Sequence, residues 1–122
     1  MADRMSRAER FGPPLLLMAV IFFLSAQPHL SSGLGWIDLV GRKLAHMIEY
    51  GLLWVLWSRG LGHRRPGAAA AIAVLYAVSD EYHQTFVAGR HGSPVDVLID
   101  GTGVTIAWAL VRRRAARRPG TA

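Results

Sequence analysis

The 122-residue sequence lacks cysteine altogether, which excludes disulfide bonds, thiolate catalysis and cysteine-ligated zinc. Charged residues are also scarce, at 18%, whereas 52% of the residues are hydrophobic. Acidic residues are fewest: eight Asp and Glu stand against fourteen Lys and Arg, for a net charge of +6. The basic residues form short clusters at the ends of apolar runs, not along one helix face among aromatics, so we expect no nucleic-acid partner. This distribution favours a membrane protein of one domain, residues 1–122.

Long apolar runs without any polar residue are scarce too. Four apolar segments can still be marked, at about residues 11–27, 37–58, 67–87 and 94–111. Each approaches the roughly 20 residues that a helix needs to cross a bilayer. A soluble helical bundle is the alternative, because the last three segments carry ionisable groups, but "AAAAIAVLYAV" and "GVTIAWALV" are apolar on every face. The sequence therefore predicts an all-α integral membrane protein, a four-transmembrane-helix bundle.

The first segment also resembles a secretory signal peptide, because a basic stretch with Arg4, Arg7 and Arg10 precedes its apolar core. Two prolines near the start of the core, Pro13 and Pro14, are typical of a helix entrance. Removing the segment would leave three spans with termini on opposite sides. We therefore expect it to be retained as the first span.

Basic residues are concentrated in alternate connections, which predicts the orientation. The N-terminal tail, the connection "SRGLGHRRPG" and the C-terminal tail are rich in arginine, whereas "PHLSSGLGW" has no Lys or Arg and "AGRHGSP" has only Arg90. Because basic residues stay on the cytoplasmic side, we expect both termini in the cytoplasm, an N-in/C-in topology. The ionisable residues within the spans then lie toward the extracytoplasmic face.

Helix periodicity groups the polar residues of the last three segments into three stripes. The stripes are Lys43, His46, Glu49 and Tyr50; Asp80, His83 and Gln84, flanked by Glu81; and Asp96, Asp100 and Gly103. Gly103 lets a neighbouring helix approach closely, because it has no side chain. Ionisable groups within a span are costly unless they pair, meet water or face the bundle interior. We therefore expect the three stripes to meet in one polar pocket near the outer surface, beside Arg90.

A buried ion-pair network that fixes the order of the helices is the alternative for any single pair, such as Lys43 with Asp80 or Arg90 with Asp96. Taken together, however, the histidines, acids and bases exceed what helix registry requires, and buried ion pairs stabilise a fold only weakly. The whole set therefore favours a functional site.

Three stretches carry a resemblance to a known family. The segment "FFLSAQP" supplies Ser25, Gln27 and Pro28, and a K-x-x-H-x-x-E-Y pattern follows at residues 43–50. The longest stretch, D-E-x-H-Q-x-F-x-x-G-R-x-x-x-x-x-D-x-x-x-D-x-x-G, covers residues 80–103. With these motifs the sequence resembles the VanZ-like family of small bacterial membrane proteins, over roughly residues 15–105.

Two departures from the family pattern leave the resemblance intact: Ala88 stands where proline is common, and Asp100 where asparagine is frequent. The resemblance implies a multi-pass protein of the bacterial cytoplasmic membrane with a link to the cell envelope. The namesake of the family is associated with teicoplanin resistance, whereas the resemblance names no biochemical activity.

One hypothesis is a membrane enzyme that acts on a lipid-linked or phosphorylated envelope substrate. Its catalytic candidates are His46, Glu49, Asp80, Glu81 and His83, and its substrate-binding candidates are Lys43, Tyr50, Gln84, Arg90, Asp96 and Asp100. Either histidine would act as acid or base, oriented by Asp80, Glu81 or Glu49, because imidazole titrates near neutral pH. Arg90 and Lys43 would hold phosphate. No cofactor is predicted, and a metal bound by the histidines and carboxylates is a weaker alternative, because no H-E-x-x-H spacing occurs.

Two further hypotheses involve no catalysis. A binding protein would use the same pocket to hold an envelope lipid or a glycopeptide and to shield a target. A small proton- or ion-coupled carrier would use the acids and histidines within the membrane, and would need to oligomerise because four helices are few for a carrier. All three hypotheses have the lipid bilayer as a partner, and they leave both catalysis and the oligomeric state open.

Overall fold

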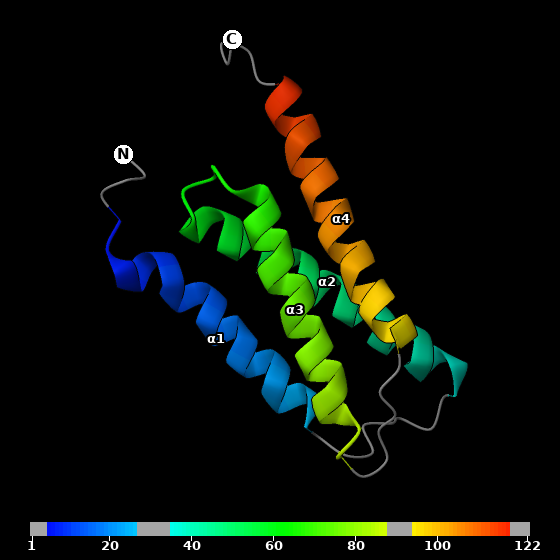
Figure 1. Ribbon diagram of the computed structural model, residues 1–122. Helices are drawn as coiled ribbons and strands as arrows, with labels where there is room; N and C mark the ends of the chain where they lie inside the picture. Colours follow the sequence, from blue (N-terminus) through cyan, green and yellow to red (C-terminus); the bar gives the residue numbers. More distant parts are fainter. Residues whose placement is uncertain (1–4, 27–34, 88–93, 118–122) are drawn as a thin grey trace.

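The computed structural model describes residues 5–26, 35–87 and 94–117, which form four α-helices and no strand. The helices are α1 (Arg7–Ser25), α2 (Trp36–Gly60), α3 (Pro66–Gln84) and α4 (Pro94–Arg117). They pack as one bundle in which each helix runs antiparallel to the next along the chain (Figure 1). We call the end where α1 and α3 finish, and where α2 and α4 begin, the distal end. The predicted all-α, four-helix architecture is confirmed for these residues.

The ends of α1 and α3 differ from the predicted segments. α1 begins at Arg7 because Ser6 and Glu9 form a capping box: the Glu9 amide donates to Ser6 Oγ at 3.1 Å, and the Ser6 amide donates to Glu9 Oε1 at 3.2 Å. α3 ends at Gln84, short of residue 87, and the Thr85 hydroxyl donates to the Tyr82 carbonyl at 2.7 Å just beyond it. Hydropathy marks the apolar length of a segment, whereas hydrogen bonds of this kind determine where the helix ends.

Two prolines stand inside α1 and explain how its start is attached to α2. Pro13 has no amide hydrogen, so the carbonyl of Glu9 has no helical donor. The Arg59 guanidinium, near the end of α2, donates to that carbonyl at 3.1 Å. Arg10 Nε donates in turn to the Gly60 carbonyl at 2.8 Å. These two arginines therefore hold the beginning of α1 against the end of α2.

The apolar core is centred on α2, which, like α3, contacts all three other helices. The buried apolar residues are Tyr50, Leu53 and Trp54 from α2, Ile21 from α1, Ala69, Ala73 and Ala77 from α3, and Val104 from α4. Alanine at every fourth position gives α3 a smooth face, which lets the larger α2 side chains pack against it. Among the described residues, α1 and α4 do not touch. The core therefore leaves much of α1 and α4 exposed on the outside of the bundle.

Gly51 and Gly103 bring the backbones of α2 and α4 together. A Cβ atom at Gly103 would overlap the carbonyl of Met47, and one at Gly51 would lie 3.0 Å from the Gly103 carbonyl oxygen. The predicted close approach at Gly103 is confirmed, and its partner is α2 of the same chain. The crossing matters for the site because it fixes the depth at which α2 and α4 present their polar residues.

Two helices, Arg7–Ser25 and Pro94–Ala116, are long and apolar enough to cross a membrane by length and composition. α2 and α3 do not meet this criterion within the described ranges; both carry several of the ionisable residues of the predicted stripes. Four crossings, and the placement of both termini in the cytoplasm, stay predictions.

Candidate functional site

Asp80 is the centre of a hydrogen-bond network at the distal end. Only 2% of its surface is exposed. Its Oδ2 accepts hydrogen bonds from Ser25 Oγ at 2.9 Å, Tyr50 Oη at 3.2 Å and Gln84 Nε2 at 3.4 Å. The donors come from α1, α2 and α3, and a buried carboxylate needs donors of this kind. Asp80 therefore ties three helices together at the distal end.

Two polar contacts join α2 to α4 beside this network. Lys43 Nζ lies 2.6 Å from Asp96 Oδ1, and His46 Nδ1 lies 3.2 Å from Asp100 Oδ1. A pairing of Lys43 with Asp80, considered from the sequence, is therefore wrong. The polar stripe of α2 packs along α4, and Asp80 receives its donors from α1, α2 and α3 instead.

Several buried polar atoms at the distal end have no hydrogen-bond partner in the part of the chain that the structure describes. They are Asp80 Oδ1, Glu81 Oε1, Asp100 Oδ1, His46 Nδ1 and His83 Nδ1. Of these atoms, His46 Nδ1 and Asp100 Oδ1 lie 3.2 Å from each other and form an ion pair when the imidazole is protonated. The atoms left without a partner among the described residues are therefore Asp80 Oδ1, Glu81 Oε1 and His83 Nδ1. Buried polar groups in folded proteins are nearly always paired, so these atoms call for water or a ligand.

The two histidines face different neighbours. The His83 ring centroid lies 4.3 Å from that of Phe22 on α1, and the His46 ring stacks on Tyr50 at 6.2 Å. The carboxylate beside His46 is Asp100, which the sequence had placed among the substrate-binding residues. The crossing of α2 and α4 determines which carboxylate lies beside His46, and residue spacing within one helix does not reveal it.

Glu49 and Glu81 add two further acids from α2 and α3. Glu49 is half-buried, and its carboxyl group is close enough to His46 for the two charges to interact. Glu81 is 7% exposed. Its carboxyl group is close enough to Asp96, Asp100 and Asp80 for their negative charges to repel its own. Arg90, the remaining predicted site residue, lies outside the described residues. The described part of the site therefore holds more acids than bases.

A family model described as VanZ/LLP1 matches residues 13–115, a range that includes all of these side chains. The chain belongs to the VanZ/LLP1 family. The resemblance inferred from the motifs is thereby confirmed. No curated protein and no solved structure matches the chain significantly. Membership of the VanZ/LLP1 family and the two apolar helices together indicate a membrane protein.

Ser25 is a site residue of this VanZ/LLP1 protein that the sequence analysis did not include among its candidates. It is 3% exposed and donates to Asp80 from the last residue of α1. Its signal in the sequence was a hydroxyl at the end of the most apolar segment, at the depth of the other polar residues. Tyr76 adds a second tie between the same helices, because its hydroxyl donates to the Met18 carbonyl at 2.5 Å.

Within the described ranges, no three His, Asp or Glu side chains are arranged so that they could hold one metal ion. The arrangement offers other chemistry. His46 beside Asp100 can accept or donate a proton, as a histidine backed by a carboxylate does in general acid–base catalysis. The unpartnered carboxylate oxygens can accept hydrogen bonds from hydroxyl, amide or ammonium groups.

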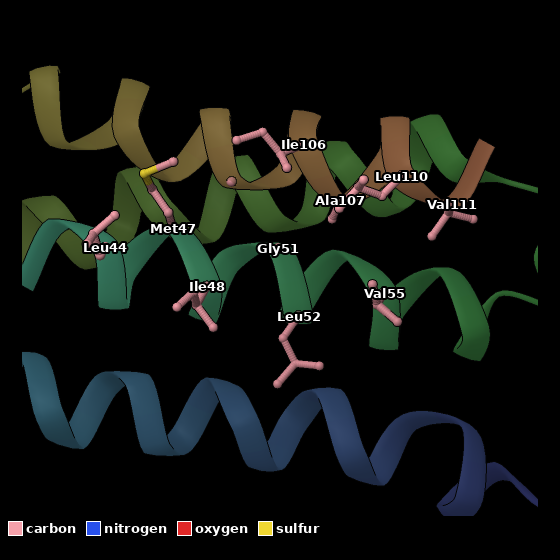
Figure 2. Close-up of a pocket in the computed structure, with 11 residues that line it drawn as sticks. Leu44, Met47, Ile48, Gly51, Leu52, Val55, Ile106, Ala107, Leu110 and Val111 are labelled. Atoms are coloured by element: carbon pink, nitrogen blue, oxygen red, sulfur yellow. The ribbon is translucent and has the colours of Figure 1, made fainter. Parts of the chain in front are cut away.

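An apolar groove of about 420 Å³ follows the α2–α4 pair of this VanZ/LLP1 protein. It is lined on α2 from Leu44 to Val55 and on α4 from Gly103 to Val111 (Figure 2). Large side chains along it, including Ile48 and Leu110, are exposed on the outside of the bundle. In a membrane protein such a groove on the outside of the bundle faces hydrocarbon.

Proposed function

We propose that this VanZ/LLP1 protein binds or processes the polar head group of a lipid-linked or phosphorylated component of the bacterial cell envelope. The observation that carries the proposal is the set of buried polar atoms without partners in the described chain, on Asp80, Glu81 and His83. Buried groups of this kind are costly unless something binds them. A head group rich in hydroxyl, amide or amine groups supplies the donors that carboxylate oxygens accept.

The proposal places the distal end on the outer side of the cytoplasmic membrane. The distribution of arginine supports this orientation: arginine is concentrated in the two tails and in the α2–α3 connection, and basic residues stay on the cytoplasmic side. The polar cluster then lies within the outer half of the bilayer. A lipid-linked envelope component carries its head group at that level, where the cluster can reach it.

Phosphate binding in this proposal depends mainly on Arg90. Lys43, the other predicted phosphate ligand, already lies 2.6 Å from Asp96. Guanidinium suits phosphate because it donates two parallel hydrogen bonds. Tyr50 and Gln84, which hold Asp80, position the carboxylate that meets the head group.

If the protein is an enzyme, His46 is its acid or base and Asp100 the residue that orients it, because their side chains lie 3.2 Å apart. A non-enzymatic binding protein would use the same cluster to hold and shield an envelope lipid or a glycopeptide, and teicoplanin-type resistance would follow from that shielding. A proton- or ion-coupled carrier is favoured by one observation, the buried carboxyl oxygens without partners.

Binding is tested by purifying the protein from a bacterial membrane and identifying retained envelope lipids by native mass spectrometry. We expect a lipid-linked or phosphorylated envelope component on the wild type, and at least about tenfold less on Arg90→Ala, because a charge-assisted bidentate contact is worth 1.4 kcal/mol or more. Glu9→Gln, at the other end of α1, is the control and should retain the lipid.

Three outcomes separate the readings. Conversion of the retained lipid that stops with His46→Ala or Asp80→Asn indicates an enzyme. Retention without conversion, together with a higher inhibitory concentration of teicoplanin in cells, indicates shielding. Retention of no envelope component, with pH-dependent flux in proteoliposomes, would reject the proposal in favour of a carrier.

A further inference from the structure

The joint between the start of α1 and the end of α2 holds two arginines on backbones that touch. A Cβ atom at Gly60 would lie 2.6 Å from the Arg10 carbonyl oxygen, so the helices meet there without a side chain between them. Arg10 Nε donates across the joint to the Gly60 carbonyl at 2.8 Å. Arg59 Nη1 donates in the opposite direction to the Glu9 carbonyl at 3.1 Å. Each arginine is thus bonded to the residue that adjoins the other, and we call Arg10 and Arg59 the arginine pair.

The arginine pair keeps most of its hydrogen-bond donors free. A guanidinium group has five N–H donors, and within the described ranges each arginine uses one of them, on a backbone carbonyl. Both side chains are partly exposed, so the remaining donors can be reached from outside the bundle. Joining the two helices therefore occupies only a small part of what this pair can bind.

The positive charge of the arginine pair is also only partly compensated. No acid of the described chain forms an ion pair with either guanidinium group. Glu9 is close enough to Arg59 for their charges to attract, but its carboxylate accepts a hydrogen bond in the capping box of α1. The free carbonyls at the end of α2 add about half a negative charge. Arg64 and Arg65, in the connection that follows α2, are exposed and add positive charge, so the joint attracts an anion.

Aromatic and aliphatic side chains adjoin the arginine pair. The guanidinium carbon of Arg10 lies 5.2 Å from the Phe11 ring centroid, and the Phe11 and Trp57 ring centroids are 6.0 Å apart. Trp57 Nε1 is buried and has no acceptor in the described part of the chain. Tryptophan beside arginine is typical of a membrane interface, where one end of the ring is wet. Leu15 and Leu16 follow on α1, about 8 Å farther along, and are exposed. A molecule with an anionic head and hydrocarbon chains fits this order of groups.

We propose that the arginine pair binds the phosphate of an anionic phospholipid whose chains lie along the exposed face of α1. The guanidinium donors that the joint leaves free hold the phosphate oxygens. A head group that also carries an ammonium is disfavoured, because its cation meets the positive charge of the joint. This inference goes beyond the proposed function, since it concerns the opposite end of the bundle and a different ligand.

The full-length protein in detergent is offered phosphatidylglycerol, phosphatidylethanolamine and phosphatidylcholine with identical chains, and bound lipid is counted by native mass spectrometry. We expect phosphatidylglycerol to exceed each of the others by at least about tenfold. Arg10→Gln and, independently, Arg59→Gln should abolish that preference, because glutamine keeps an N–H donor for the carbonyl but has no charge. Arg113→Gln is the matched control. It removes the same charge from an exposed position at the same end of the bundle, on α4, which does not touch α1 among the described residues.

Thermal unfolding separates a lipid site from a purely structural joint. Added phosphatidylglycerol should raise the melting temperature of the wild type and of Arg113→Gln above the value with phosphatidylcholine, because a ligand of the folded state stabilises it. That increase should disappear in Arg10→Gln and in Arg59→Gln. Variants of the pair that are less stable without lipid but keep the full increase would overturn the inference, since the arginines would then only join the helices.

Equal retention of the three lipids contradicts the inference, and so does an equal loss of preference in Arg113→Gln, because net charge alone would then explain the binding. Displacement of phosphatidylglycerol by an equal concentration of soluble glycerophosphoglycerol would show that the head group alone binds, and would refute the lipid part. Arg90→Ala should keep the preference for phosphatidylglycerol. That result distinguishes this lipid from the component proposed for the distal end, so either proposal can fail without the other.

Discussion

At the scale of single residues, Asp80 matters most for the distal end. One of its oxygens receives Ser25, Tyr50 and Gln84, and the other has no donor in the described chain. Asp80 Oδ2 therefore has a structural role, whereas Asp80 Oδ1 is available to bind a ligand. Hydrogen bonds to a charged acceptor contribute about 1.5–3 kcal/mol each, so the bond from Ser25 to Asp80 Oδ2 helps to hold α1 in place.

Ser25→Ala tests that structural role. Removing the hydroxyl leaves Asp80 with one donor fewer and should lower the free energy of unfolding by about 1–3 kcal/mol. Ser79→Ala is the matched control, because Ser79 is exposed and bonds only to the Tyr76 carbonyl of its own helix. Thermal unfolding in detergent measures both. Equal, small effects of the two substitutions would contradict the network.

A double-mutant cycle tests which acid Lys43 pairs with. The coupling between Lys43→Ala and Asp96→Ala should be about 0.5–1 kcal/mol, modest because the two side chains are 38% and 25% exposed. The coupling between Lys43→Ala and Asp80→Ala should be close to zero. The reverse result, with Asp80 as the stronger partner, would contradict the pairing described here.

The sequence predicted which polar residues lie on the same face of each helix, but not how they pair across helices. Periodicity of 3.6 residues places Lys43 and His46 on one stripe of α2, and Asp96 and Asp100 on one stripe of α4. Which stripes face each other depends on helix rotation and crossing, which periodicity does not contain. The partnership of Ser25 with Asp80 escaped for the same reason, since a single hydroxyl forms no stripe.

At the scale of elements, the crossing of α2 and α4 determines the depth of the site. Gly51 and Gly103 allow backbone contact there, and the polar pairs follow on the distal side of that contact. Hydropathy predicted four helical segments and the glycine predicted the close approach. The capping box that starts α1 and the hydroxyl beyond α3 were not recognised, because hydropathy does not register local hydrogen bonds.

Gly103→Ala tests the crossing. Its new methyl group would overlap the Met47 carbonyl, so the free energy of unfolding should fall by about 1–3 kcal/mol. Gly101→Ala is the control on the same helix, where a methyl group meets nothing within 4 Å. That substitution should be neutral or stabilise the protein by up to about 1 kcal/mol, because alanine favours a helix. The same loss from both substitutions would remove the evidence for a close crossing.

At the scale of the whole molecule, the even number of helices brings the start of α1, the end of α4 and the α2–α3 connection to one end. Arginine is concentrated at that end, and the buried acids lie at the other. This polarity along the bundle agrees with the predicted N-in/C-in topology. The sequence predicted it from charge alone, whereas the side of the membrane depends on insertion and not on the fold.

Labelling of introduced cysteines measures the side directly, and the absence of native cysteine makes the experiment clean. A cysteine at Ser93 should react with an impermeant thiol reagent in intact cells. A cysteine at Gly62 should react only after the membrane is opened. Labelling in the reverse order would place the polar cluster on the cytoplasmic side.

The central claim is that the buried polar atoms of the distal end bind a head group. An experimental structure of the protein in nanodiscs made from bacterial membrane lipids tests it most directly. We predict that a lipid head group lies within hydrogen-bond distance of Asp80 Oδ1 or Glu81 Oε1, the carboxylate oxygens without partners in the described chain. Finding these oxygens paired only with protein groups or with one another, and no lipid among them, would contradict the claim.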